Sequence, residues 1–380
     1  MELKCIYMRG GTSKGCMFRE DDLPADKSLW DEIFLKVMGS PDPKQMDGMG
    51  GTITLNNKIV IVSRSYEQGI DVNYLVAQVL PDKPVVDYSA NCGNMTSAVG
   101  PFSILSGLVA PKDGLMKLRM RNLNSGKLIE ETVPVKDGKP VENGDCCIAG
   151  IDAPGAELKV NFLEPGGAKT GKLLPTGSVS DEIDGILVSV VDIANVFIFI
   201  NAPDLGVKGN ETPDEINSNL ELLNRVAQIR GKVAQKIGIV ERWEDAALKT
   251  PGSPKVVLIS GPSTYTDSTG KTMHADDMDL CVRLISLEKT HKSLALTAAI
   301  ATGGACFIEG GLPRKLAEGR GLTDSVRLGH PCGTMEVFVD CEKSAGEVQI
   351  KGVAARRTAR RIMEGTIYIP DAPVKRRSDL

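Results

Sequence analysis

The chain of 380 residues carries a formal net charge of −4, with 42% hydrophobic and 25% charged residues. This length predicts two domains, and the composition is typical of a folded globular chain, which excludes long disordered, collagenous or coiled-coil segments. The acidic balance and an aromatic content of only 4% disfavour a nucleic-acid partner.

Nothing in the sequence indicates export or membrane insertion. The first residues, MELKCIYMRGG, lack a cationic region followed by an apolar run. The longest apolar stretch, residues 186–200, is interrupted by Asp192 and Asn195 and is too short to span a bilayer. The nine cysteines follow no regular framework. We therefore expect reduced thiols and a cytoplasmic location, with no membrane partner.

Helices are expected at four places along the chain, with β-branched runs between them that predict buried strands. The four are residues 28–38, 93–108, 213–237 and 293–303. The first is the clearest, because Trp30, Ile33 and Val37 lie on one face at helical spacing.

The second half of the chain repeats the first. Four segments recur in the same order, and the pairs are residues 18–24 with 199–206, 58–63 with 255–260, 71–76 with 277–282, and 118–120 with 326–328. Strands interleaved with few helices, present twice, predict an α+β fold of two similar pseudo-symmetric domains. We place them at residues 1–182 and 183–380, with the active site in the cleft between them.

Two glycine-rich loops look like phosphate loops but depart from that motif. In residues 9–15 (RGGTSKG) the lysine precedes the last glycine, and after residues 166–172 (GGAKTGK) Leu173 stands where a Ser or Thr must bind magnesium. Tight hairpin turns account for both loops. A functional interpretation of the first is a cradle of backbone N–H groups and the Thr12 and Ser13 hydroxyls for an oxyanion.

Cys92 is the residue most indicative of chemistry. In residues 87–98 (DYSANCGNMTSA) small polar residues surround it at the point where a helix is expected to begin. The unpaired N–H groups and partial positive charge of a helix N-terminus favour a thiolate and bind a carboxylate beside it. An inert thiol in a buried helix cap is an equally good interpretation of this segment alone.

Metal binding is not expected. The three histidines are scattered without the spacing of a zinc helix, and the adjacent Cys146 and Cys147 are poorly suited to binding one metal together. A basic cluster on an expected helix indicates a solvated face or a subunit contact in a homo-oligomer, rather than an RNA site. Its members are Arg356, Arg357, Arg360 and Arg361.

The motif at residues 91–94 (NCGN), inside a duplicated α+β chain, resembles the diaminopimelate-epimerase-like superfamily. Longer strings are similar to its PrpF family of methylitaconate Δ-isomerases, 2-methylaconitate isomerases and 4-oxalomesaconate tautomerases. These strings are MRGGTSKG (8–15), DGMGG (47–51), NCGNMTSAVGPF (91–102), LLPTG (173–177), GHPCG (329–333) and RTARRIMEG (357–365). The resemblance covers nearly the whole chain.

The resemblance implies proton transfer at a carbon next to a carboxylate, without a cofactor. The family's lysine on a first-domain strand and its NCGN cysteine correspond to Lys58 and Cys92. Epimerases of the superfamily use a cysteine from each half, but the counterpart of Cys92 falls near Leu296 and Thr297, which argues against racemisation by a cysteine pair. One group removes an allylic proton and the other returns one elsewhere; which is the base is left open.

The substrate-binding residues that we predict carry donors suited to carboxylates. They are Thr12, Ser13, Asn91, Gly93, Asn94, Arg283, His330 and Cys332. The predicted function is an isomerase that moves a C=C bond in a small unsaturated di- or tricarboxylate, of the 3-methylitaconate/2,3-dimethylmaleate type. The other two PrpF activities are alternatives within the family. A non-catalytic carboxylate-binding protein and a cysteine-dependent hydrolase are alternatives of other classes.

Overall fold

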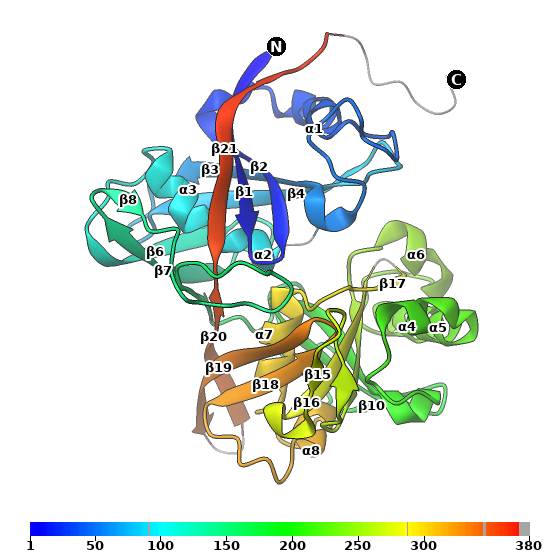
Figure 1. Ribbon diagram of the computed structural model, residues 1–380. Helices are drawn as coiled ribbons and strands as arrows, with labels where there is room; N and C mark the ends of the chain where they lie inside the picture. The colour runs from blue at the N-terminus through cyan, green and yellow to red at the C-terminus, as the bar shows by residue number, and fades with distance from the viewer. Residues whose placement is uncertain (90–91, 287, 345–346, 372–380) are drawn as a thin grey trace. The chain divides into compact units, whose positions relative to one another are not determined.

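The computed structural model describes residues 1–380 except 90–91, 287, 345–346 and 372–380 (Figure 1). The chain forms two compact units, unit 1 of Met1–Val160 with Arg356–Leu380, and unit 2 of Asn161–Ala355. The division expected at residues 182 and 183 therefore differs from these units in two ways. Unit 2 begins earlier in the chain, and the C-terminal segment belongs to unit 1 because its strand pairs with the first strand of the chain.

Among the described residues, unit 1 is a mixed sheet with three short α-helices. Its strands are β1 (Glu2–Gly10), β2 (Ser13–Arg19), β3 (Lys58–Arg64), β4 (Val72–Val79), β5 (Val86–Asp87), β6 (Gly114–Asn122), β7 (Leu128–Lys136), β8 (Lys139–Pro140), β9 (Leu158–Leu163, which runs on into unit 2) and β21 (Ala359–Tyr368). Its helices are α1 (Trp30–Met38), α2 (Gly93–Thr96) and α3 (Val99–Leu105).

Unit 2 has the same kind of sheet and, in its described part, five α-helices. Its strands are β10 (Asp181–Ile183), β11 (Ile186–Ile193), β12 (Asn195–Asn201), β13 (Lys255–Ser260), β14 (Tyr265–Thr266), β15 (Thr272–Met273), β16 (Leu280–Ser286), β17 (Lys289–Thr290), β18 (Ser325–His330), β19 (Gly333–Ser344) and β20 (Glu347–Arg357, which ends in unit 1). Its helices are α4 (Pro213–Ser218), α5 (Leu220–Lys236), α6 (Ala246–Lys249), α7 (Leu296–Ala305) and α8 (Leu312–Leu316). Within the described residues, no helix has both the length and the apolar character needed to cross a membrane.

The two units repeat one order of strand pairing. In unit 1, β1–β2 is antiparallel, β2–β3 parallel, β3–β4 antiparallel, β4–β6 parallel and β6–β7 antiparallel. In unit 2 the same alternation runs through β11–β12, β12–β13, β13–β16, β16–β18 and β18–β19. Helices also occupy matching connections, since α1 and α5 precede the third strand of each series. The duplicated α+β fold predicted from the sequence is therefore confirmed.

For the pair of segments 71–76 and 277–282, the structure shifts the match by two residues from the one seen in the sequence. The Asp71 carboxylate accepts the backbone N–H of Arg119 at 2.8 Å, and the Asp279 carboxylate accepts that of Arg327 at 2.8 Å. Asp279, rather than Asp277, is therefore the structural counterpart of Asp71. Both carboxylates join the start of one strand to its parallel neighbour.

Two of the four expected helices are interrupted, and the helix expected for the basic cluster is absent. Residues 93–108 form α2 and α3, because Pro101 lacks an N–H and is accommodated only in the first turn of a new helix. Residues 213–237 divide at Asn219, whose side chain accepts the N–H of Leu222 and caps α5. The arginine cluster lies in extended backbone, and Arg360 pairs with Arg9 of β1.

Register assigns the side chains of the unit 1 sheet to two faces, because directly opposed residues point to the same side. One face carries Tyr7, Cys16 and Ile59, which pack with Phe34 of α1 in the main core. We call this the α1 face. The other face, which we call the α2 face, carries Gly10, Ser13, Gly15, Lys58 and Tyr74. Figure 1 shows α1 and α2 on different sides of these strands.

Candidate active site

Lys58 is the first residue of β3 and lies directly opposite Gly15 of β2. A Cβ at Gly15 would come within 2.1 Å of the Lys58 carbonyl oxygen and 2.8 Å of the Lys58 Cβ. Only glycine fits this approach of the two backbones. The half-buried Lys58 side chain therefore leaves the sheet on the α2 face, beside a position that carries no side chain.

Helix α2 packs against the same face. A Cβ at Gly10 would lie 2.6 Å from the carbonyl oxygen of Asn94, so the hairpin of β1 and β2 contacts the helix backbone directly. Tyr74 of β4 is fully buried, and its hydroxyl lies 2.9 Å from Thr96 Oγ1. These contacts fix the start of α2 over the strands that carry Lys58.

Cys92 immediately precedes the first turn of α2, in extended backbone with φ of −103°. Its carbonyl oxygen accepts the backbone N–H of Thr96 at 3.0 Å and the Thr96 hydroxyl at 3.2 Å. Its half-buried Sγ lies 3.9 Å from the Oγ of Ser13, a residue of the α2 face. Within unit 1, Cys92 therefore meets the face of the sheet from which Lys58 projects.

Of the residues predicted to bind substrate around Cys92, the structure describes Thr12, Ser13, Gly93 and Asn94. The Asn94 side-chain amide donates to Thr12 Oγ1 at 3.0 Å, which ties α2 to the turn of the hairpin. Gly93 is the buried first residue of α2, and Ser13 is only 2% exposed. Asn91 lies outside the described residues.

Arg283 lies in β16 of unit 2 and is 1% exposed. Its guanidinium donates to four backbone carbonyl oxygens, those of Asn210 at 2.9 Å, Glu211 at 2.6 Å, Val282 at 2.9 Å and Gly329 at 3.5 Å. Burial lowers the pKa of this guanidinium. These contacts give Arg283 a role in holding the main chain of unit 2. Its predicted contact with a substrate carboxylate stays a prediction.

His330 and Cys332 lie at the turn between β18 and β19 of unit 2 and contact each other. The backbone N–H of Cys332 donates to His330 Nδ1 at 3.3 Å, and His330 is fully buried. Cys332 Sγ accepts the Ser268 hydroxyl at 3.1 Å and donates to the Lys292 carbonyl at 3.0 Å. Burial raises the pKa of the Cys332 thiol, opposed by the Ser268 hydrogen bond.

Gln78 lies next to the candidate proton-transfer lysine and was not singled out from the sequence. It lies opposite Lys58 in the antiparallel pairing of β3 with β4, so both side chains leave the α2 face. Its amide donates to the carbonyls of Thr54 and Asn57, at 3.3 and 3.0 Å, which fixes the segment leading into Lys58. The available signal was a polar residue in phase with Tyr74, on the same face of the strand as Val72 and Val76.

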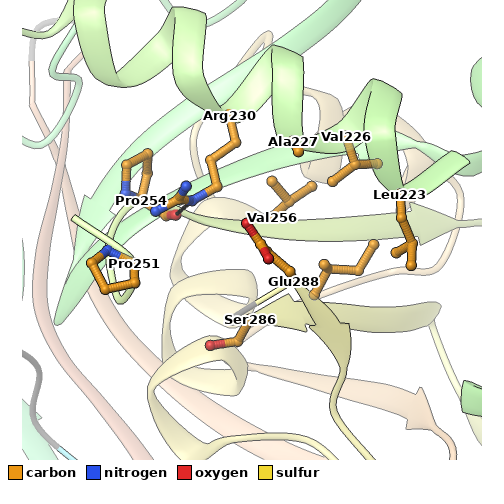
Figure 2. Close-up of a pocket in the computed structure, with 10 residues that line it drawn as sticks. Leu223, Val226, Ala227, Arg230, Pro251, Pro254, Val256, Ser286 and Glu288 are labelled. Carbon is orange, nitrogen blue, oxygen red and sulfur yellow. Dashed lines mark hydrogen bonds between the residues drawn. The ribbon is translucent and has the colours of Figure 1, made fainter. Parts of the chain in front are cut away.

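A pocket in unit 2 lies between α5 and β13 (Figure 2). Leu223 and Val226 form its apolar wall, with Glu288 at the opposite side. The Arg230 guanidinium in its lining donates to the Pro254 carbonyl at 2.9 Å. None of the predicted site residues lines this pocket. No group of acidic, histidine or cysteine side chains suited to a metal occurs within the described parts of the chain.

The duplicated units define a protein of the diaminopimelate-epimerase-like fold. A hydroxyproline epimerase from Agrobacterium vitis is similar in structure, with a TM-score of 0.54 and 12% identity over 96% of this chain and 92% of that chain. This likeness shows the fold alone. The crystal structure of a methylitaconate-delta-isomerase is similar with a TM-score of 0.82 and 41% identity, over 97% of this chain and 96% of that one.

Sequence comparison identifies the family within that fold. The model of the family described as PrpF protein matches residues 1–370. A 3-methylitaconate isomerase of Eubacterium barkeri is 41% identical over 377 residues, 98% of each chain. A 2-methyl-aconitate isomerase of Shewanella oneidensis is 40% identical over 388 residues, 97% of each chain. A 4-oxalomesaconate tautomerase of Pseudomonas putida is 35% identical over 369 residues, 97% of this chain and 96% of that one.

The chain belongs to the PrpF family. The prediction that it is an isomerase of this family, built on the diaminopimelate-epimerase-like fold, is confirmed by these matches.

Proposed function

We propose that this isomerase converts 3-methylitaconate and 2,3-dimethylmaleate into each other by moving a C=C bond. The observation that carries the proposal is the 41% identity with a 3-methylitaconate isomerase over 98% of both chains. An insertion or loss of a domain would have shortened that coverage. The substrate is a small unsaturated dicarboxylate, and we expect the protein to work on it in the cytoplasm without a nucleic-acid or membrane partner.

Lys58 and Cys92 are the proposed proton-transfer groups. One removes the proton from the carbon that bears the methyl group, which is both allylic and next to a carboxylate. The electrons move through the C=C bond, and the other group delivers a proton to the terminal methylene carbon, which becomes a methyl group. Protons and electrons balance without an external acceptor. The shared α2 face of unit 1 supports this pairing, because both side chains approach one surface of the same sheet.

The dienolate formed between the two transfers needs its negative charge stabilised by fixed donors. The Ser13 hydroxyl and the start of α2 are the groups best suited to this, since Ser13 is buried beside Cys92. Thr12 and Asn94 are held together by a hydrogen bond, and we propose that they orient a substrate carboxylate. His330, Cys332 and Asn91 remain proposed substrate contacts from the family resemblance.

The second candidate is a 2-methylaconitate isomerase. It is favoured by the 40% identity with the Shewanella enzyme over 97% of both chains, which is nearly as high as the first match. The same two proton-transfer groups serve both reactions, so their positions do not separate the substrates. The 4-oxalomesaconate tautomerase activity is the third candidate, at 35% identity.

Hydrogen exchange at carbon tests the proposal directly. The protein is incubated with 3-methylitaconate or 2-methylaconitate in deuterated water, and deuterium entry and product formation are followed by NMR. We expect conversion of 3-methylitaconate with deuterium in the new methyl group, lost in Cys92→Ser and Lys58→Ala and retained in Cys147→Ser and Lys4→Ala. Faster turnover of 2-methylaconitate would favour the second candidate. Tight binding of these acids without exchange would make the chain a carboxylate-binding protein.

A further inference from the structure

Three cations lie in one row across the α1 face of the unit 1 sheet. Arg9 of β1 is directly opposite Lys14 of β2 on one side and Arg360 of β21 on the other. Figure 1 shows β21 running alongside β1. Directly opposed residues of antiparallel strands place their Cβ atoms about 5 Å apart on the same side of the sheet. The row therefore places the Cβ atoms of three cationic residues side by side on one face of the sheet.

The charges of this row are not neutralised within the described residues. None of Arg9, Lys14 and Arg360 forms an ion pair with a described residue. Neighbouring arginines differ, since Arg361 pairs with Glu142 and Glu364. Like charges directly opposite each other on a sheet destabilise the fold. A row of unpaired positive charges therefore lowers the stability of the fold, and this cost indicates a role other than folding.

The side chains of the row have defined positions. Arg9 is half-buried, and its NH1 group donates to the carbonyls of Gly11 and Thr358 at 2.9 and 3.0 Å. The Lys14 ammonium lies 5.9 Å from the centre of the Tyr7 ring, on the α1 face. Arg360 is exposed. Burial lowers the pKa of Arg9, and the nearby charge of Arg360 lowers it further, as expected for two guanidinium groups without an anion between them.

The row is separate from the residues proposed for catalysis. Lys58, Ser13 and the start of α2 lie on the α2 face, whereas Lys14 and Arg9 alternate with them along the strands and point to the opposite side. An anion bound by the row would therefore lie across the sheet from Cys92. Its binding is independent of which substrate the isomerase takes.

We propose that Arg9, Lys14 and Arg360 form a binding site for a small polyvalent oxyanion, either inorganic phosphate or a polycarboxylate. A guanidinium group donates two parallel hydrogen bonds from one plane, and an ammonium group adds a compact positive charge. Together these groups can bind several oxygens of one ligand. A polyvalent anion matches the charge of the row and removes its repulsion. Arg9 is already held by two carbonyls, so it loses little freedom on binding.

Phosphate is the probe for the test, used with the full-length protein at low ionic strength because salt screens exposed charges. Binding is followed by ³¹P NMR titration and by the change in Tm. We expect saturable binding that Arg360→Gln weakens about tenfold or more, as does Lys14→Met, since each removes a charge-assisted hydrogen bond. Arg360→Lys keeps the charge and should keep most of the affinity. Lys4→Met is the matched control, because Lys4 is exposed on the same strand as Arg9.

The outcomes separate the site from general attraction of anions. Absence of saturable phosphate binding to the wild-type protein overturns the proposal, as does equal weakening by Lys4→Met. Phosphate binding that survives in the double variant Lys14→Met/Arg360→Gln also overturns it, because the ligand then lies elsewhere. Citrate distinguishes the two sources of the ligand: stronger binding than phosphate at the same residues indicates a polycarboxylate site, and weaker binding indicates a phosphate site. Arg360→Gln alone carries the test if Lys14→Met does not fold.

Discussion

Gly15 and Lys58 face each other across the parallel pair β2 and β3 at a distance that leaves no room for a side chain on Gly15. A Cβ there would lie 2.1 Å from the Lys58 carbonyl oxygen. The backbone and Cβ of Lys58, the proposed proton-transfer lysine, are thus held in place by the backbone of the neighbouring strand β2. The approach also leaves the Lys58 side chain without a side-chain neighbour from Gly15 on the α2 face.

Gly15→Ala is expected to displace Lys58 and to lower the rate of isomerisation more than it lowers stability. The clash is with backbone, so β2 and β3 must separate; overpacking of this kind costs about 1–3 kcal/mol. The free energy of unfolding and the turnover rate measure the two effects. Gly261→Ala is the matched control, because a Cβ at Gly261 meets nothing within 4 Å. Wild-type turnover in Gly15→Ala would show that this approach does not position the lysine.

Glu131 predicts an unusual dependence of stability on pH. This fully buried carboxyl in β7 accepts the backbone N–H of Gly100 in α3 at 2.8 Å, and its other oxygen has no hydrogen-bond partner among the described residues. Burial raises its pKa from 4.5 to about 8, opposed by the Gly100 hydrogen bond. The folded protein therefore keeps this proton across a range of pH where the unfolded chain releases it.

The neutral Glu131 carboxyl contributes fully to stability at pH values below its ordinary pKa of 4.5. This contribution is lost as the pH rises toward the pKa of about 8 in the folded protein. Within that window the group lowers the free energy of unfolding by about 1.4 kcal/mol per pH unit. Glu131→Gln keeps an acceptor for Gly100 without the charge, so it should flatten the profile and stabilise the protein near pH 8. Denaturant unfolding at several pH values measures this. Glu130→Gln, on the adjacent and less buried residue, should leave the slope unchanged; an unchanged slope in Glu131→Gln would contradict the prediction.

The sequence allowed the duplicated architecture to be predicted because its signals are local. The β-branched runs at residues 58–63 and 255–260 are the third strands of the two pairing series, β3 and β13. The start of a helix after Cys92 was likewise visible in the small polar residues around it. The break between α2 and α3 could not be predicted, because the apolar pattern continues through Pro101. In the structure a new helix, α3, begins two residues before that proline.

Features set by distant partners could not be predicted. The spacing of Arg357 and Arg361 is compatible with a helix. Instead Arg357 ends β20, which pairs with β19, and Arg361 lies in β21, which pairs with β1. The glycine loop at residues 166–172 is organised by the carboxylate of Asp192, which accepts the N–H groups of Lys169 and Thr170 at 2.8 and 2.7 Å. The loop thus binds an anion, but one supplied by the protein itself.

Arg283 provides a test between the predicted substrate contact and the observed main-chain contacts. Arg283→Met removes a buried group that serves four carbonyl oxygens. Hydrogen bonds from a charged donor contribute about 1.5–3 kcal/mol each, so we expect a loss of about 3 kcal/mol or more in the free energy of unfolding. Arg225→Met, an exposed arginine of α5 in the same unit, should cost little. Unchanged stability with a raised KM would instead assign Arg283 to the substrate.

Ser13→Ala separates a role in the chemistry from a role in folding. The Ser13 hydroxyl lies 3.9 Å from Cys92 Sγ and is 2% exposed. If it stabilises the developing charge of the dienolate, its removal should lower kcat about tenfold to a hundredfold with little change in KM, because the interaction strengthens only in the transition state. Stability should change by less than about 1 kcal/mol, since the methyl group of alanine fills nearly the same space. Ser103→Ala is the matched control: it is fully buried in the same unit, and its hydroxyl donates within α3 to the Val99 carbonyl at 2.7 Å. Steady-state kinetics that show equal losses in both variants would assign Ser13 to the packing of the hairpin on α2 rather than to the reaction.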